Sequence, residues 1–397
     1  AVLQIDDKLQ KLDWRSLLEL DYFELIDRKI LSELVRAVVA STVTAVEGEE
    51  GVRQRRQCHW LERFKDVYLA LEHAAQFIQV LDITQLQMES LTDGVKKYAS
   101  QWFRLDQRYR KFVYHLRESG QASLLGELAM QVENLYGNNY LSRLNDRWQQ
   151  HVDAAQQWEA APVVLQRNFF SRYVQPFVER RTKVCVLISD AFRYEVGEEL
   201  QSLIRQEDRF EADLEPMLSM LPSYTQLGMA ALLPNSSLQL VDNDSGDAIV
   251  DGQSAQGSVN RGKILATRVP ASQVVRAKDL LAMNQADSRA LLRDNEVVYV
   301  YHNLIDKTGD TRDTEERVFA AAEETLSELI RLVKKLTNAN ASNLLITADH
   351  GFIYQNHPLQ ESDFLSGEPE GDEVLYRDRR FVLGRSLREG ASFKTFN

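Results

Sequence analysis

Three short apolar runs in the second half of the chain limit its possible folds more than any other feature. They are VCVLI at 184–188, VVYVY at 297–301 and LLIT at 344–347. Amphipathic helical patterns follow the first run and separate the second from the third. Strands that are apolar on both faces and alternate with helices are typical of a parallel sheet covered on both sides. We therefore predict an α/β domain over residues 176–397.

The first half has a different pattern. Between Leu17 and Leu34, apolar residues recur at steps of three and four, and glycine and proline are scarce. This spacing predicts helices, so we expect an all-α domain over residues 1–175, with partner binding as its default role. We expect a turn or loop at the polar run 46–57, and an insertion or mobile loop at the glycine-rich run 241–262.

Composition excludes several classes of protein. The 397 residues carry a net charge of −12, which does not favour a nucleic-acid surface, and no basic stripe is evident. Two cysteines, Cys58 and Cys185, suggest neither a disulfide framework nor a thiolate zinc site. We find no membrane-spanning stretch and no signal peptide, so we expect a cytoplasmic protein that does not act at a membrane. The chain begins without Met and stops at SFKTFN, so we expect a piece of a longer protein, with the α/β domain truncated at its C-terminal end.

Acidic residues follow all three predicted strands. Asp190 follows the first, Asp306 the second, and the pair Asp349–His350 the third. Ligand sites of parallel sheets lie at the carboxyl ends of the strands, so these groups could converge. Convergent carboxylates repel one another unless a cation lies between them, which predicts a divalent metal site. The alternative is that Asp349 and His350 only make a structural hydrogen bond. The donor set suits Zn²⁺, Mn²⁺ or Mg²⁺ without choosing among them.

A hydroxyl group accompanies this cluster of acids. In LPSYTQLGMAALLP at 221–234, Ser223 and Gln226 have the spacing of a capping box, which would place Thr225 in the first helical turn. Backbone N–H groups there favour an anion. A neighbouring metal would lower the pKa of the Thr225 hydroxyl enough for nucleophilic attack. The alternative is that Ser223 and Thr225 only cap a helix.

These motifs, in this order, resemble the alkaline phosphatase superfamily. The forms VLISDAFRYEVGEEL, LPSYTQLGMAALLP, VYHNLIDKTGD and LLITADHGFIY are similar to the PglZ domain of bacterial BREX-type phage-defence systems. The resemblance runs from Val184 to the end of the chain, and the helical half resembles the region before this domain in longer members. It implies an alkaline-phosphatase-like, mostly parallel sheet flanked by helices and preceded by an all-α domain.

The resemblance also implies metal ligands. Asp190, Asp349, His350 and the nucleophile Thr225 match the first metal site of the superfamily. For the second metal site of the superfamily, Asp306 is the one position where this sequence has the usual ligand type.

The rest of the second site departs from the superfamily. Asp310 stands where it has a histidine, and no distant histidine ligand is evident. His302 and His357 are substitutes for that ligand, although we expect them to be structural or exposed. Arg193 could clamp phosphate oxygens or be an ordinary helix-surface charge, and Lys307 is a weaker candidate.

The resemblance implies a metal-dependent phosphohydrolase that works with other BREX defence proteins. The superfamily also contains monoesterases, mutases and sulfatases, and among these activities we expect a phosphodiesterase or nuclease. Zn²⁺ is the expected ion, with Mn²⁺ and Mg²⁺ as alternatives, in one or two copies. The expected substrate is a phosphodiester, with nucleic acid as one candidate. The alternative is a catalytically weak or inactive scaffold subunit that assembles other defence proteins.

Overall fold

The structure is a computed structural model of the whole chain. It describes residues 5–40, 45–55, 57–207, 209–241, 243, 246–309, 317–354, 356, 369–378, 381–390 and 394–396. The chain forms two compact units, which we describe separately. One consists of Ala1–Met88 and Ser100–Gln149, and the other of Glu89–Ala99 and Gln150–Asn397. The domain boundary expected at residue 175 stays a prediction.

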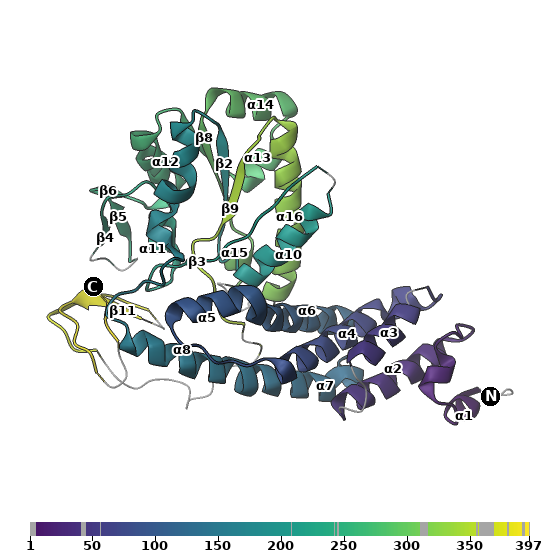
Figure 1. Cartoon of the computed structure of the whole chain (residues 1–397). Coiled ribbons are helices and arrows are strands. Elements are labelled where there is room, and N and C mark those ends of the chain that lie inside the picture. Colours follow the sequence, from purple (N-terminus) through teal and green to yellow (C-terminus); the bar gives the residue numbers. More distant parts are fainter. Residues whose placement is uncertain are drawn as a thin grey trace. The chain divides into compact units, whose positions relative to one another are not determined.

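The first unit is helical throughout its described elements, as its apolar spacing predicts. Helices α4 and α6 pack along each other at its centre, and Tyr68, Phe77, Tyr109 and Phe112 are among the side chains that they bury. The elements are α1 (Ile5–Leu9), η1 (Trp14–Leu17), α2 (Glu24–Val39), α3 (Ala45–Arg55), α4 (Leu61–Ile83), α6 (Phe103–Ser119), α7 (Ala122–Asn134), the π-helical η3 (Leu135–Leu141) and the first part of α8 (Ser142–Ala154) (Figure 1).

The expectation of a loop after the first long helix was wrong, because that segment forms α3. Its last residue, Arg55, is buried and donates hydrogen bonds to both carboxylate oxygens of Asp27, at 3.1 and 2.5 Å. Gly51 leaves room for the Trp14 ring, since a Cβ at this position would lie 3.3 Å from it. Glycine and charge therefore serve helix packing here, and local composition alone was misleading.

The second unit contains the predicted parallel sheet. The strand order is β7-β8-β2-β9, formed by β2 (Val184–Ser189), β7 (Ser272–Arg276), β8 (Val297–His302) and β9 (Leu344–Thr347). All neighbouring strands in this sheet are parallel. The three strands expected from the apolar runs are therefore confirmed, and their carboxyl ends lie side by side. The edge strand β7 was not predicted, since its residues are only partly buried or exposed.

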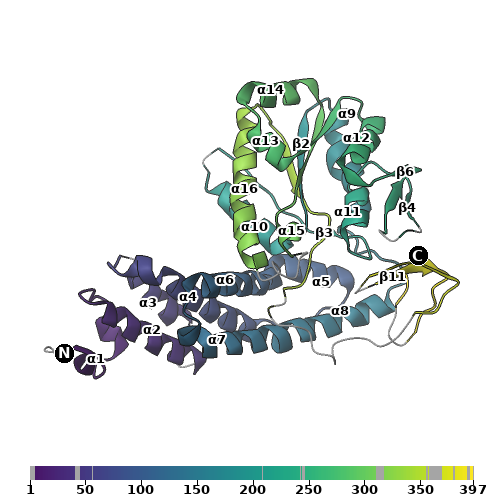
Figure 2. The ribbon, with the colours of Figure 1, turned by 180° about the vertical axis from the view of Figure 1, so that it is seen from behind.

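Helices cover both faces of this sheet (Figures 1 and 2). One face carries α10 (Tyr194–Arg205), α13 (Ala277–Ala282) and α16 (Val318–Asn338), and the other carries α9 (Gln175–Glu179), α11 (Thr225–Ala231) and α12 (Gly257–Arg268). Alternate side chains of a strand point to opposite faces. Val186 and Ile188 of β2 accordingly share a buried core with Met229 of α11 and Leu265 of α12. This α/β layering confirms the expected fold class.

The segment expected as a mobile insertion is partly ordered as a small antiparallel sheet. Strands β4 (Leu238–Leu240), β5 (Ala248–Val250) and β6 (Gln253–Ser254) form it, and α12 follows directly. The buried Ala248 and Val250 join the core beside α11, which is why this polar stretch folds onto the domain.

The remaining elements of this unit are short. Strand β1 (Val164–Leu165) pairs in parallel with β3 (Met217–Leu218), and β10 (Glu373–Arg377) pairs antiparallel with β11 (Val382–Arg385). The others are α5 (Leu91–Lys97), the first two residues of the π-helical η2 (Tyr98–Trp102), η4 (Gln166–Asn168), η5 (Phe170–Val174), α14 (Gln285–Asp294) and α15 (Ile305–Gly309). Across the part of the chain that the structure describes, no helix has the length and apolar character to cross a membrane.

Candidate active site

The carboxyl ends of three adjacent strands bring a carboxylate and imidazole cluster together. Asp190 follows β2, Asp306 lies in the first turn of α15 after β8, and His350 follows β9. One ligand atom from each of these residues lies within 4.8 Å of the other two. His350 Nε2 is 3.5 Å from Asp190 Oδ1, 3.9 Å from Asp306 Oδ1 and 3.5 Å from Asp349 Oδ2. The fifth predicted ligand, Asp310, lies outside the described residues.

In two carboxylates of the cluster, one of the two oxygens accepts a hydrogen bond. The backbone N–H of Ala191 donates to Asp349 Oδ1 at 3.1 Å, and the Asn303 amide donates to Asp190 Oδ2 at 3.2 Å. The opposite oxygens, Asp190 Oδ1 and Asp349 Oδ2, are buried without a hydrogen-bond partner among the residues that the structure describes. Buried carboxylate oxygens without donors are costly, so this arrangement fits a bound divalent cation.

The turn after β2 has an unusual backbone conformation. Ala191 has a φ of 57°, in the left-handed region that residues with a side chain seldom adopt, and it is buried. This turn aims the Ala191 N–H at the Asp349 carboxylate. A strained conformation of this kind persists where the surrounding structure imposes it, and such positions concentrate at functional sites.

Burial and mutual repulsion shape the electrostatics of the site. Burial raises the pKa of Asp190 above its ordinary value, and the Asp349 and Asp306 carboxylates raise it further. Burial also raises the pKa of Asp349. Without a cation the cluster therefore tends to retain protons. A divalent cation would remove this tendency by stabilising the charged carboxylates.

The hydrogen bonds of His350 indicate which ring nitrogen can act as a ligand. Its Nδ1 lies 3.1 Å from the Gly351 carbonyl oxygen, which can only accept, so Nδ1 is the donor in this contact. Nε2 faces the carboxylates and Thr225, and its lone pair is available to a metal in the neutral ring. A neutral imidazole oriented in this way is suitable as a metal ligand.

Thr225 lies at the first position of α11, in the first helical turn as expected, with its Oγ1 3.0 Å from His350 Nε2. The predicted capping box was wrong, because Tyr224 rather than Ser223 is the N-cap and no side chain caps the helix. Tertiary packing explains the shift: the Tyr224 hydroxyl donates to the Gly246 carbonyl oxygen at 2.8 Å.

A glycine allows α11 to approach this cluster. A Cβ on Gly228 would lie 2.2 Å from the Asp349 carbonyl oxygen, far closer than real Cβ contacts. Only glycine permits this approach. The helix that carries Thr225 therefore packs directly on the backbone of a predicted metal ligand.

Arg193 is not an ordinary surface charge, since its side chain is only 9% exposed. Its guanidinium donates to the Phe352 carbonyl oxygen, lies 4.4 Å from the Tyr354 ring centroid, and has its Nε 3.7 Å from the buried Glu195 carboxylate. These contacts connect the turn after β2 with the loop after β9. They favour a positioning role over direct phosphate binding, which stays a prediction.

His302, a candidate substitute for the distant histidine ligand, has a structural role. His302 is buried, with Nδ1 2.9 Å from Ser189 Oγ and Nε2 3.0 Å from Glu328 Oε2, so both ring nitrogens are engaged. This is the structural role expected for it. His357 lies outside the described residues. The Lys307 backbone N–H donates to the Asn303 side-chain oxygen at 2.8 Å.

Two amide side chains at the site were not predicted from the sequence. Asn303 directly follows β8, so the strand-end argument that found the acids could also have found it. Gln166 donates to the Ala348 and Asp349 carbonyl oxygens at 3.0 and 2.5 Å, from a segment that precedes the sheet by many residues. No sequence signal pointed to Gln166.

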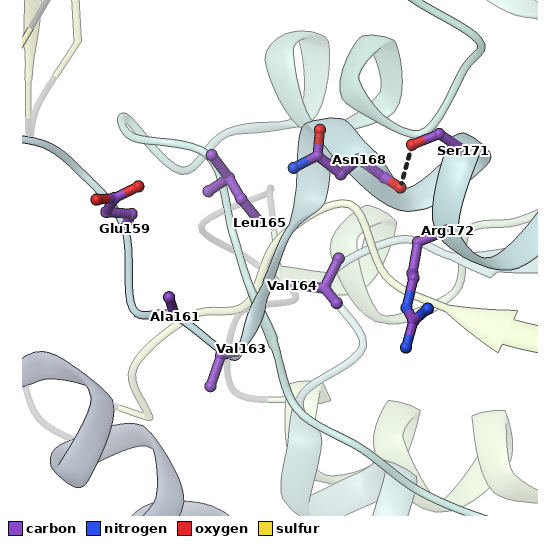
Figure 3. A pocket seen from close by; sticks show the side chains of 8 residues that line it. All are labelled: Glu159, Ala161, Val163, Val164, Leu165, Asn168, Ser171 and Arg172. Atoms are coloured by element: carbon purple, nitrogen blue, oxygen red, sulfur yellow. Dashed lines mark hydrogen bonds between the residues drawn. The ribbon is translucent and has the colours of Figure 1, made fainter.

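A separate cavity of about 420 Å³ lies on the segment that precedes β2 (Figure 3). The Ser171 hydroxyl donates to the Asn168 carbonyl oxygen at its edge, at 3.0 Å. None of the predicted site residues lines this cavity. The lining residues are Glu159, Ala161, Val163, Val164, Leu165, Asn168, Ser171 and Arg172.

Comparison with known proteins decides the family. The family model of the BREX system PglZ alkaline phosphatase-like domain matches residues 169–396, more than half of the chain. The chain belongs to the PglZ family. The family assignment confirms the resemblance drawn from the strand-end motifs, and it supports a hydrolase at the level of the superfamily.

Two relatives of this PglZ-family chain extend the similarity into its helical half. It is 34% identical over 386 residues to the alkaline phosphatase-like protein PglZ of Bacillus cereus (strain H3081.97), covering 96% of this chain and 45% of that protein. It is also 34% identical over 377 residues to the alkaline phosphatase-like protein BrxZ of Escherichia coli O9:H4 (strain HS), covering 91% of this chain and 43% of that protein. The chain thus spans less than half the length of these relatives.

Proposed function

We propose that this chain is the catalytic part of a metal-dependent phosphohydrolase, with Thr225 as nucleophile. The observation that carries the proposal is the pair of buried carboxylate oxygens, Asp190 Oδ1 and Asp349 Oδ2, that find no donor among the described residues and lie 3.5 Å from His350 Nε2. A cation is the economical counterpart for such a donor set.

The proposed metal ligands are Asp190, Asp349 and His350, with Asp306 close enough to take part. Oxygen donors with one imidazole suit Zn²⁺, Mn²⁺ or Mg²⁺, and Zn²⁺ is our first choice. When bound, the ion would supply Lewis acidity that lowers the pKa of a neighbouring hydroxyl. A second ion, with Asp310 among its ligands, belongs to the same proposal.

The chain's own residues then define the reaction. Thr225 Oγ forms a bond to phosphorus while the bond from phosphorus to the leaving oxygen breaks. The Thr225 proton passes to solvent, and the leaving oxygen takes a proton from water. Water then attacks the phosphothreonine, which releases the phosphate product and restores the hydroxyl. Thr225 Oγ1 and His350 Nε2 are 3.0 Å apart, close enough for both atoms to be ligands of one ion, which would keep the Thr225 oxygen in place for this step.

We propose a phosphodiester as the substrate and BREX defence proteins as the partners. The names of the family and of its relatives support the BREX context. Nuclease action is the more specific form of the proposal. The net charge of −12 gives it no support, since binding of a nucleic acid depends on Lys and Arg.

A scaffold function is the second candidate, and one observation favours it. Within the described part of the chain, a single His, Cys, Asp and Glu group has metal-site geometry, and it contains one histidine. Arg193, the predicted phosphate clamp, is also engaged by protein groups. A protein with one metal and no clamp could still bind phosphate but would turn over slowly or not at all, and would serve chiefly to assemble other defence proteins.

The deciding experiment measures metal content. The purified protein is loaded with Zn²⁺ or Mn²⁺, freed of excess ion and analysed for its metal elements, with Asp349→Ala as the site variant. We expect about one equivalent in the wild type and a loss in the variant. Hydrolysis of a chromogenic phosphodiester by the loaded protein then separates the two candidates.

The outcomes of this experiment are distinct. Metal in the wild type but not in Asp349→Ala, with turnover that depends on Thr225, supports the hydrolase. The same metal binding without turnover supports the scaffold. If neither protein holds metal above background, the proposal of a metal-dependent hydrolase is wrong.

A further inference from the structure

We infer that Gln166 is a positioning residue. It fixes the backbone at Asp349, just after β9, relative to the segment that leads to Thr225. This inference rests on the proposed metal centre. Gln166 lies in η4, three residues before the region matched by the family model. Gln166 is only 1% exposed, so its polar side-chain atoms must find partners inside the protein.

The contacts of Gln166 reach two segments of the site. Its Nε2 donates to the Ala348 carbonyl oxygen at 3.0 Å and to the Asp349 carbonyl oxygen at 2.5 Å. Its Oε1 accepts from the Met220 backbone N–H at 3.0 Å. Met220 lies five residues before Thr225. One amide therefore joins the backbone of a proposed ligand to the segment that carries the proposed nucleophile.

The orientation of this amide follows from its partners. A backbone N–H can only donate and a backbone carbonyl oxygen can only accept, so Oε1 must face Met220 and Nε2 must face Asp349. Glutamate lacks the donor and methionine lacks both groups. Among side chains of this size, glutamine alone can make all three bonds without carrying a charge.

The surrounding structure fixes both partners of the amide. Leu165, the neighbour of Gln166, pairs with Leu218 in the β1–β3 pair. On the other side, the Asp349 carbonyl oxygen is in close contact with Gly228 of α11. The Asp349 peptide is thus held between the Gln166 amide and the helix of Thr225. A shift of this peptide would move Asp349 Oδ2 relative to Asp190 and His350.

The test compares metal affinity with stability in the intact chain. The variants are Gln166→Met, which removes all three hydrogen bonds at similar volume, and Gln166→Glu, which keeps the acceptor for Met220. The matched control is Asn343→Ala. The Asn343 amide donates to the Lys183 carbonyl oxygen at 2.9 Å, at the amino end of the same sheet and away from the site. The Kd for Zn²⁺ is measured by competition with a chromophoric chelator.

We expect Gln166→Met and Gln166→Glu to weaken Zn²⁺ binding by about 10-fold or more, as is usual for residues that orient metal ligands. Asn343→Ala should lower the denaturant midpoint and leave the Kd unchanged. An unchanged Kd in both Gln166 variants, in a wild type that binds Zn²⁺, would overturn the inference and leave the proposed function standing. A wild type that binds no Zn²⁺ would overturn both.

A measurement on the wild type covers the case in which the Gln166 variants do not fold. Hydrogen exchange of the Met220 N–H is followed with and without Zn²⁺. If Gln166 couples the two segments, Zn²⁺ binding at Asp349 should slow exchange at Met220. Slower exchange around Asp349 without any change at Met220 would contradict the inference.

Discussion

The Oγ1 of Thr225 lies 3.0 Å from the Nε2 of His350, although 125 positions separate them in the sequence. The helix start that carries one and the strand end that carries the other meet because Gly228 lets α11 pack on the Asp349 backbone. The hydroxyl therefore lies at the carboxylate cluster in the folded chain. This relationship motivates the first prediction.

Thr225→Val should separate catalysis from metal binding. Valine has nearly the shape of threonine but no hydroxyl, so no phosphothreonine can form. We expect hydrolysis of a chromogenic phosphodiester to fall by at least about 1000-fold, while the loaded protein keeps its metal by elemental analysis. Thr225→Ser is the control, because it keeps an oxygen in this position and should retain part of the activity. Equal rates for the valine variant and wild type would rule out Thr225 as nucleophile.

The stabilisation given by metal should increase with pH. The folded-state pKa values of Asp190 and Asp349 are raised, chiefly by burial. The metal-free folded protein therefore holds extra protons, and its stability falls as pH rises from the ordinary aspartate range through the raised pKa values. Added Zn²⁺ replaces these protons, so its effect should grow over the same window.

The measurement of this pH effect is the melting temperature with and without Zn²⁺, at about pH 5 and about pH 8. The Zn²⁺-dependent shift should be larger at the higher pH. Asp349→Ala is the control, since it should show little shift at either pH. A larger shift at the lower pH would contradict protonation of the buried carboxylates.

Gly228→Ala, a substitution within α11, should destabilise the protein and weaken metal binding at the site. The new Cβ would meet the Asp349 carbonyl oxygen at 2.2 Å, so α11 or the Asp349 backbone must move. We expect a loss of about 1–3 kcal/mol in the free energy of unfolding and weaker Zn²⁺ binding. The matched control is Gly126→Ala in α7, where a Cβ meets nothing within 4 Å and should stabilise by up to about 1 kcal/mol. Similar stability changes in both variants would refute the close approach.

Arg193→Ala should lower the stability of the protein rather than its affinity for substrate. The variant removes a cation beside the buried Glu195 carboxylate and exposes the ring of Tyr354. We expect a loss of about 3 kcal/mol in the free energy of unfolding, measured with denaturant. The control is Arg293→Ala, whose ion pair with Asp294 is exposed, so the free energy of unfolding should stay nearly unchanged. If Arg193→Ala instead keeps its stability and raises KM, Arg193 binds phosphate directly.

The sequence by itself determined the parallel sheet and the ends of its strands. Apolar runs alternating with helical patterns predict that architecture, because strands buried on both faces are apolar along their whole length. Once the strands are parallel, topology alone places Asp190, Asp306 and Asp349 at one edge. The fold class and the convergence of the carboxylates could therefore be predicted without a structure.

Tertiary structure decided the contacts that no local pattern encodes. The polar run before residue 56 forms a helix, α3, that is stabilised by the buried ion pair of Arg55. The helix α11 begins one residue later than predicted, because Tyr224 packs against the Gly246 segment. The roles of Gly228 and Gln166 arise from contacts with Asp349, which is more than 100 positions away in each case. Close approach and buried hydrogen bonds depend on which segments meet in space. Sequence periodicity reports burial along one element, but it does not identify the segment on the other side.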